Sequence, residues 1–436
     1  MGTSSRVLVA LFVAGVVAVH GEARAQTPLA GALTWAHPGT GPSEETGEIA
    51  ATRDGGFLSF VNFTGSVDVG AVQATAPGGA EERAVALVRH SPQGQPSLLR
   101  VINGWHGFHL TVDTSGNIVL LAWPAGPPLG NLFSDDPHLM KFDSVGRLLW
   151  LRPIRSSELT AQALVTDRDG NIGIGGYTLT AQGSARLAFV KYDGEGVKQW
   201  AFVDVNTVQS VARAATVDSE GHFYVAGDAI GAISSAEPYL IRISASGQAQ
   251  WRRRLVGALG FAYGVATHGN RVVMVGTYAN TFTFAGQPHT STANLGIDQD
   301  AFVAAWTREG EERWAWNFAF DIEGVAMDFN DGVTVIGGYQ GGSPDTAALG
   351  SPAGNASSAA NVYVAKFDRL QGTPRWVKSF PSGQDRSSPG LDAGSVAVTQ
   401  DGRPAVLGRF HDTLQVGAQT WTASGVSDLF LFGFEP

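Results

Sequence analysis

The chain has 436 residues, a formal net charge of −10, 56 glycines and no cysteine. The absence of cysteine excludes disulfides and thiolate metal ligands. The negative charge argues against non-specific binding to nucleic acid or anionic lipid, because both require a cationic surface. Abundant glycine indicates many tight turns and favours an all-β chain.

Residues 1–25 predict a cleaved signal peptide. Arg6 precedes an unbroken apolar run at 7–19, and residues 23–25 supply a small-x-small cleavage site. The run is shorter than the roughly 18 apolar residues that a spanning helix needs, and no later stretch approaches that length. A lipid anchor would need a cysteine just after the run. We therefore expect an exported protein, secreted or periplasmic, that is not lipid-anchored and not inserted in a membrane.

One predicted β-hairpin carries a tryptophan at a fixed place. An apolar residue lies four positions before a glycine, and the tryptophan lies four positions after that glycine. The glycine suits the left-handed residue that closes such a turn. Clear copies end at Trp150, Trp200, Trp251 and Trp314, a copy with one more turn residue ends at Trp376, and a degenerate copy spans 90–98.

A second hairpin lies between these, built on an Asp-x-x-Gly turn that leads into a β-branched run ending in glycine. Clear copies lie at 112–118, 166–172 and 217–223, and weaker copies surround 54–56, 268–270, 331–332 and 401–402. Seven such units occur. Two hairpins per unit give four strands, which is the composition of one propeller blade.

The two ends of the chain supply the hairpin that is still missing. Residues 428–434 form a third strand with no fourth, and residues 32–36 form a fourth strand with no third. Pairing them closes the ring and removes the free sheet edges. The sequence therefore predicts an all-β fold, a single seven-bladed β-propeller of four-stranded antiparallel blades over residues 26–436.

Inserts between the second and third strands lengthen some of the units. Similar inserts contain 67–70 in blade one, 282–286 in blade five and 414–417 in blade seven, and a looser insert spans 344–360 in blade six. Because variable loops on a regular scaffold often carry function, we expect ligands to bind at these inserts or at the mouth of the axial channel.

The repeat resembles the bacterial β-propeller repeat of large exported proteins, sometimes called the SBBP type. Residues 300–303 and 364–368 match its Asp-x-Phe-Val-x-Lys-Phe-Asp stretch. The Gly-x-x-x-Trp element is also similar to the tryptophan-docking repeat of quinoproteins and of outer-membrane assembly scaffolds. In both, the tryptophan packs between adjacent blades. The resemblance implies the architecture and a structural role for the five tryptophans named above.

Several motifs suggest chemistry, but each has a plainer interpretation. Residues 173–176 are glycine-rich without the lysine of a phosphate loop. Residues 167–171 begin like a calcium loop but lack the distal glutamate, which favours an Asx turn. His106 and His109 could approach each other, but no third zinc ligand is evident. Residues 252–254 are three arginines, which favour a charged outer edge strand over an anion site.

The sequence predicts no catalytic, cofactor-binding or metal-binding residue, and no cofactor. A hydrolase elbow and a His-Glu-x-x-His motif are absent, and a quinone site would need adjacent cysteines. The leading hypothesis is a monomeric, non-catalytic interaction module or scaffold that binds an unknown protein or glycan. One alternative is a propeller hydrolase or lyase with its site at the axial channel, and another is a periplasmic scaffold for envelope assembly.

Overall fold

The computed structural model describes residues 30–41, 44–79, 82–125, 136–230, 235–292, 299–318, 321–329, 332–340, 360–382, 394–425 and 427–436. The predicted signal peptide and nearly all of the insert at 344–360 lie outside these ranges. Within them, no helix is long and apolar enough to cross a membrane.

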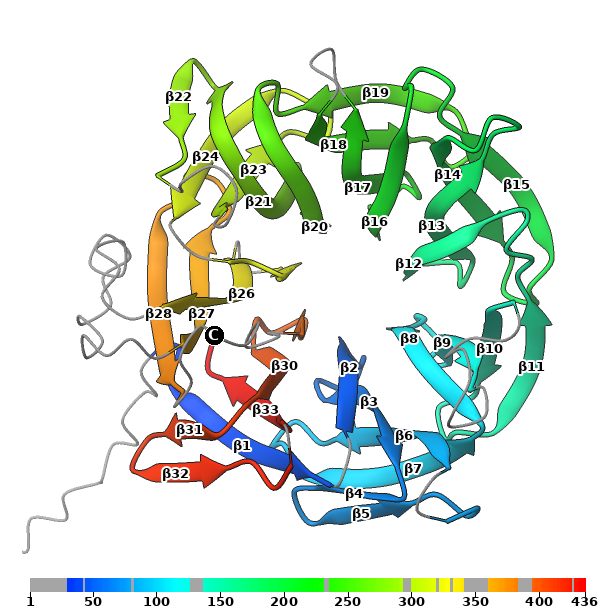
Figure 1. The fold of residues 1–436 in the computed structure, drawn as a ribbon, viewed down its shortest axis with the longest axis vertical. Helices are drawn as coiled ribbons and strands as arrows, with labels where there is room; N and C mark the ends of the chain where they lie inside the picture. The colour runs from blue at the N-terminus through cyan, green and yellow to red at the C-terminus, as the bar shows by residue number, and fades with distance from the viewer. Residues whose placement is uncertain are drawn as a thin grey trace, which may run out of the picture.

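Seven antiparallel sheets surround one axis, each with its first strand innermost and its fourth strand outermost (Figure 1). Blades 1 to 4 are made of β2 (Glu44–Ala51), β3 (Phe57–Thr64), β6 (Arg83–His90) and β7 (Pro96–Asn103); β8 (Trp105–Val112), β9 (Ile118–Pro124), β10 (His138–Phe142) and β11 (Leu148–Pro153); β12 (Thr160–Thr166), β13 (Ile172–Leu179), β14 (Ala185–Tyr192) and β15 (Lys198–Val203); and β16 (Ser210–Val217), β17 (Phe223–Ile230), β18 (Ala236–Ile243) and β19 (Ala249–Arg254).

Blades 5 to 7 follow the same order. They are made of β20 (Ala258–His268), β21 (Arg271–Phe284), β23 (Asp300–Trp306) and β24 (Glu312–Phe318); β25 (Gly324–Met327), β26 (Gly332–Gln340), β27 (Ala360–Asp368) and β28 (Pro374–Pro381); and β29 (Ser395–Val398), β30 (Pro404–Phe410), β33 (Asp428–Phe434) and β1 (Leu33–Thr40). The predicted seven-bladed, all-β propeller is confirmed.

The ring closes through the two ends of the chain, as predicted. Strand β1 is antiparallel to β33, with Trp35 opposite Gly433, and the blue and red ends of the ribbon meet there (Figure 1). The backbone N–H of Glu435 donates to Ala32 O at 2.9 Å. Gly31 has a φ of +70°, so it takes the left-handed place that turn glycines hold in the continuous hairpins.

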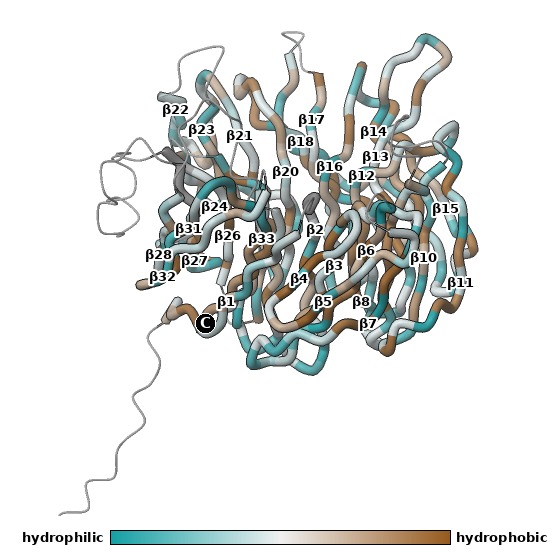
Figure 2. Tube along the Cα trace, turned by 60° about the horizontal axis from the view of Figure 1, so that its bottom comes forward, coloured by the Kyte–Doolittle hydropathy of each residue, from teal (hydrophilic) through white to brown (hydrophobic). Residues whose placement is uncertain are grey.

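The inserts of blades 1, 5 and 7 form extra hairpins between the second and third strands, where the sequence placed them. They are β4 (Ser66–Val69) with β5 (Val72–Thr75), the end of β21 with β22 (Gln287–Thr290), and β31 (Thr413–Val416) with β32 (Gln419–Thr422). The hairpin β4–β5 pairs with β1 on the outside of the ring and makes the sheet of blade 7 six-stranded (Figure 2).

These hairpins pack one face against the scaffold, while the expectation that they bind ligands stays a prediction. Val67 and Val69 of β4 pack in one buried cluster with Leu429 and Leu431 of β33. Alternate apolar residues in the insert are therefore buried against the neighbouring blade.

The tryptophans dock between blades, which confirms their predicted structural role. The indole Nε1 of Trp200 donates to Ala245 O of the next blade at 3.0 Å, and the ring lies on the turn glycine Gly247, whose added Cβ would fall 2.8 Å from it. The same Nε1 bond is made to the following blade by Trp150, Trp251 and Trp314, and the rings of Trp376 and Trp35 lie on Gly31 and Gly94.

Candidate functional site

The turn that begins like a calcium loop is an Asx turn, as favoured from the sequence. Oδ1 of Asp167 accepts the backbone N–H groups of Asp169 and Asn171, both at 2.9 Å. Its Oδ2 lies 3.0 Å from Nζ of Lys191. Burial alone would raise the pKa of Asp167, but the hydrogen bonds from Asn171 and Lys191 outweigh burial and hold the pKa below its usual value.

This ion pair is part of a repeated structural device. Asp113 pairs with Lys141 at 3.0 Å, and Asp328 pairs with Lys366 at 2.7 Å. Lys141 and Lys366 also donate to a turn carbonyl of the next blade, at 3.1 Å to Gly194 O and 3.0 Å to Gly402 O. The pairs therefore join blades at the end of the propeller where the turns lie.

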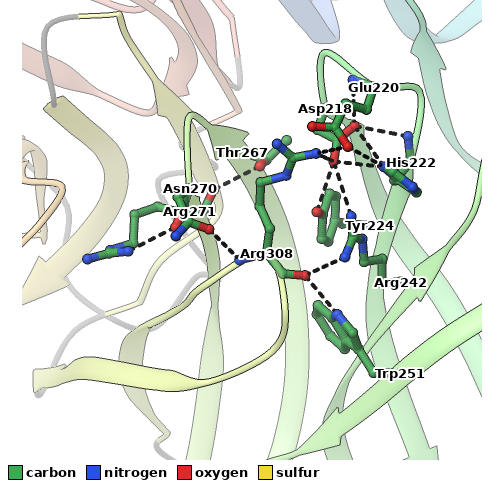
Figure 3. Close-up of polar contacts among 10 residues, drawn as sticks. All are labelled: Asp218, Glu220, His222, Tyr224, Arg242, Trp251, Thr267, Asn270, Arg271 and Arg308. Carbon is green, nitrogen blue, oxygen red and sulfur yellow. Dashed lines mark hydrogen bonds and ion pairs between the residues drawn. The ribbon is translucent and has the colours of Figure 1, made fainter.

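The densest charged cluster joins blades 4 and 5 at the same end (Figure 3). The Arg308 guanidinium lies 2.8 Å from Asp218 and 2.9 Å from Glu220, and the Tyr224 hydroxyl donates to Asp218 at 3.0 Å. Arg308 O accepts the Nε1 bond of Trp251 at 2.8 Å. Because these groups satisfy one another across a blade junction, we interpret the cluster as structural.

The two histidines considered for zinc have different partners. Nδ1 of His109 lies 2.6 Å from Oε1 of Glu48, whereas Nε2 of His106 lies 3.5 Å from the Asn62 amide. In the part of the chain that the structure describes, no group of three or more His, Asp or Glu side chains could hold a metal ion.

The three consecutive arginines are bound within the protein. Arg252 pairs with Asp204 at 2.9 Å and Arg254 lies 3.8 Å from Glu237. Arg253 donates through Nε to Gly310 O at 2.6 Å. All three are half-buried. These contacts do not form an anion site, and they hold the outer strand of blade 4 to its own blade and to blade 5.

A shared irregularity distinguishes the channel mouth. Blades 1 to 5 each have a β-bulge in the inner strand, near the end away from the turns. In blade 4 the bulged residue is Arg213, which lies between Ala212 and Ala214. The glycine within the second strand follows from it, since an added Cβ on Gly227 would lie 1.9 Å from Val211 O. A bulge redirects one side chain, and bulges are common beside binding sites.

The same position in the seven blades carries seven different residues. In blade 6 Glu323 takes it, because its N–H donates to Ile336 O in the register that the bulged strands use, and Gly394 precedes β29 in the same way in blade 7. In blade order the residues are Thr46, Phe108, Gln162, Arg213, Tyr263, Glu323 and Gly394. We call this set the bulge ring. The buried positions of the blades carry similar residues from one blade to the next. The residues of the bulge ring, in contrast, differ in size, charge and aromatic character.

A cavity of about 430 Å³ opens on the bulge ring at blades 5 to 7. Its lining residues are Tyr263, Thr277, Gln299, Asp321, Ile322, Glu323 and Gly394. The Tyr263 side chain is exposed at 38%, and the Thr277 hydroxyl donates to the Gln299 side-chain oxygen at 2.5 Å. One wall is therefore an aromatic ring and the others are hydroxyl, amide and carboxyl groups.

The Glu323 carboxyl has a pKa well above the usual value of a glutamic acid. Burial, with a smaller effect from the charge of the neighbouring Asp321, raises the pKa of Glu323 from 4.5 to about 8, although Arg409 opposes both. At pH 7 the Glu323 carboxyl is therefore mostly neutral and is able to donate a hydrogen bond to a ligand. A cavity with one neutral and one charged carboxyl offers both a donor and an acceptor to a polar ligand.

Charged groups elsewhere at the mouth are paired. Arg213 holds Asp228 at 2.6 Å, and its guanidinium lies over the Phe261 ring at 5.0 Å. Burial raises the pKa of Asp228 above its usual value although Arg213 opposes it. Phe108, exposed at 40%, adds a second accessible aromatic ring and contacts Trp123 edge-on.

Sequence reasoning did not find Tyr263, Gln299, Asp321 or Glu323. A signal for two of them exists, since Tyr263 lies 13 residues before Gly276 and Glu323 lies 14 residues before Gly337, each a glycine within the next strand. This spacing indicates a residue at the channel mouth only when the β-bulge in the inner strand is already known.

Comparison with known proteins finds only distant structural likeness. No protein-family model and no curated protein matches the chain. Among solved structures, it is similar to the β-propeller domain of the Trilobed protease from Pyrococcus furiosus, with 9% identity, a TM-score of 0.44, and coverage of 88% of this chain and 97% of that one.

Two other solved structures show the same level of likeness. An acylaminoacyl peptidase from Pyrococcus horikoshii has 10% identity and a TM-score of 0.45 over 87% of this chain, which spans 52% of the peptidase. The polysaccharide lyase Uly1 has 10% identity and a TM-score of 0.47, with 89% of both chains covered. Likeness at this level says nothing about activity.

Proposed function

We propose that this chain is an exported, non-catalytic interaction module that binds an uncharged glycan at the mouth of the axial channel. The observation that carries the proposal is the cavity of about 430 Å³ between Tyr263 and Glu323. It lies where the repeated scaffold varies most, and variable positions on a regular scaffold are where repeat proteins bind.

The chemistry of the cavity suits sugar hydroxyls. The exposed Tyr263 ring offers an apolar face for the C–H side of a sugar ring. The Gln299 amide, the Thr277 hydroxyl and the neutral Glu323 carboxyl supply donors and acceptors. The nearby Asp321 charge would repel an anionic sugar, which favours a neutral glycan.

A second candidate is a propeller hydrolase or lyase acting on a glycan at the same cavity. The observation in its favour is the pair of Asp321 and Glu323, of which Glu323 has a pKa raised to about 8. A protonated carboxyl beside an ionised one is the pattern that general acid catalysis at neutral pH needs.

The predicted signal peptide and the likeness of the repeat to that of bacterial exported proteins support placement in the periplasm or the medium. They rest on residues 1–25 and on the motifs at 300–303 and 364–368. A neutral glycan of the cell envelope or the surroundings would be within reach there.

A glycan array probed with the mature protein tests the proposal. Tyr263→Ala should weaken binding at least about tenfold, whereas Phe329→Ala should leave it unchanged. Phe329 is a matched control because it is an aromatic residue exposed at 59% at the turn end of blade 6. Full retention of binding by Tyr263→Ala, or no bound glycan at all, would contradict the proposal.

Product analysis on the bound glycan separates the two candidates. Glu323→Gln keeps a hydrogen-bonding side chain but cannot transfer a proton. Intact glycan after incubation with the native protein supports the binding module. Cleavage by the native protein that disappears in Glu323→Gln, with binding retained, would replace the binding module by the enzyme.

A further inference from the structure

One of the seven blade junctions lacks a docked tryptophan. The other six hold an indole from the outer strand of the preceding blade against the next turn, as described above. Between blades 1 and 2 the motif position is Leu98, which is exposed at 40%. The strand bulge explains this difference, because β7 places Leu98 opposite Val88 and Arg100 opposite Leu87.

A cavity of about 220 Å³ lies at this junction, and we call it the junction slot. Its apolar lining is Leu58, Leu99, Val112 and Ile118, and its polar lining includes Thr114, Ser144 and Arg89. The slot opens at the turn end of the propeller, between the Asp-Gly turns of blades 1 and 2. The cavity lined by Tyr263 and Glu323 lies at the opposite end of the propeller.

Part of the slot's lining matches the surroundings of a docked indole, while Arg100 contacts the turn glycine Gly146 and donates to its carbonyl at 2.9 Å. Ile118 begins the second strand of blade 2, as Phe223 does in blade 4 and Phe57 in blade 1. Those two phenylalanines contact the docked Trp200 and Trp35, with ring centroids 5.9 Å and 6.0 Å apart. Ile118 thus occupies the position from which a docked indole is contacted elsewhere.

The hydrogen-bond acceptor for an indole is also in place. Ser144 lies two residues before the turn glycine Gly146, as Gly194 and Ala245 do before theirs. Those two carbonyls accept indole Nε1 bonds at 3.2 Å and 3.0 Å. The Ser144 carbonyl instead receives a long 3.4 Å contact from Arg89, whose guanidinium is held at the rim by Asp54 at 2.6 Å.

We propose that the junction slot binds a tryptophan side chain presented by a partner protein. The indole inserts between Leu58, Leu99 and Ile118 and donates through Nε1 to Ser144 O. The peptide that carries it lies at the rim, beside Arg89 and Asp54. The six docked indoles within the chain show which ring such a junction accepts, and four of them show that Nε1 donates to the turn of the next blade. The slot makes the propeller an adaptor with a protein at one end, independently of what binds at the channel mouth.

Ligand-observed NMR with N-acetyltryptophanamide tests the slot directly. We expect saturable binding at millimolar concentration, and at least several-fold weaker binding of the 1-methylindole analogue, which lacks the Nε1 donor. Leu99→Trp fills the slot from within and should abolish binding. Leu98→Trp is the matched control, since it adds the same ring at the adjacent, exposed position and should bind like the native protein.

Three results would overturn the inference: no saturable binding to the native protein, equal binding of the methylated analogue, or undiminished binding by a folded Leu99→Trp variant. The analogue comparison uses only the native protein, so it decides the matter even if Leu99→Trp fails to fold. None of these results depends on glycan binding. Tryptophan binding at the slot and glycan binding at the channel mouth are therefore tested separately.

Discussion

The buried histidine beside the ring closure should make the protein sensitive to mild acid. His90 has no exposed surface, its Nε2 lies 2.9 Å from the Ser59 hydroxyl, and its ring stacks on Trp35 with centroids 5.8 Å apart. Burial, with a smaller effect from the charge of His37, lowers the pKa of His90 from 6.5 to about 4. The folded protein therefore resists protonation at a pH where the unfolded chain accepts it.

The sign and size of the effect follow from linkage. Above pH 6.5 the imidazole is neutral in both states, and its contribution to stability is fully present. As the pH falls toward 4, the unfolded state alone gains the proton, which lowers the free energy of unfolding by roughly 3 kcal/mol. His90→Gln keeps a hydrogen-bonding group but does not titrate, so it should lose correspondingly less stability over this range.

Urea denaturation of the native protein and His90→Gln at several pH values between 4 and 7.5 measures the difference. The carboxylates that also titrate in this range are common to both proteins and cancel in the comparison. Parallel loss of stability in the two proteins would refute the assignment of His90 as a buried neutral imidazole.

Three further results are expected from the fold. Deleting residues 428–436 removes β33 and leaves β1 without its partner, so circular dichroism melting should lose its cooperative transition; an unchanged melting curve would contradict the ring closure. Trp200→Ala should lower the free energy of unfolding by about 3–5 kcal/mol in denaturant titration, and a change as small as that of a surface substitution would mean that docking does not hold the blades. Lys366→Met should lower it by a similar amount, about 3–5 kcal/mol, because it removes the cation that pairs with the buried Asp328 carboxylate; a neutral result would show that the pair is dispensable.

The architecture could be predicted because each repeat carries local sequence features that determine its strands and turns. A turn glycine and a tryptophan at fixed spacing define each outer hairpin, and the copies at the two chain ends require closure. The motif even extends to the closing hairpin, since Gly31 lies four residues before Trp35. These features depend on short sequence separations and on residue types with few alternatives, such as glycine at a left-handed position.

The candidate site could not be predicted, because it depends on register and on packing between distant segments. Tyr263 and Glu323 reach the mouth only through the bulge position, which is an extra residue in one strand rather than a residue type. Gln299 and Asp321 join them from the connections of blades 5 and 6. The Leu98 position shows the same limit, since a shift of the bulge moved it out of the junction that its motif predicts.

A crystal structure of the mature protein with the tightest-binding neutral glycan from the array tests the central claim most directly. We predict a sugar ring stacked on Tyr263 and within hydrogen-bonding distance of Glu323, in the cavity of about 430 Å³ at blades 5 to 7. A glycan found instead at the turn end of the propeller, or on the outer hairpins, would contradict the assignment of the bulge ring as the binding site.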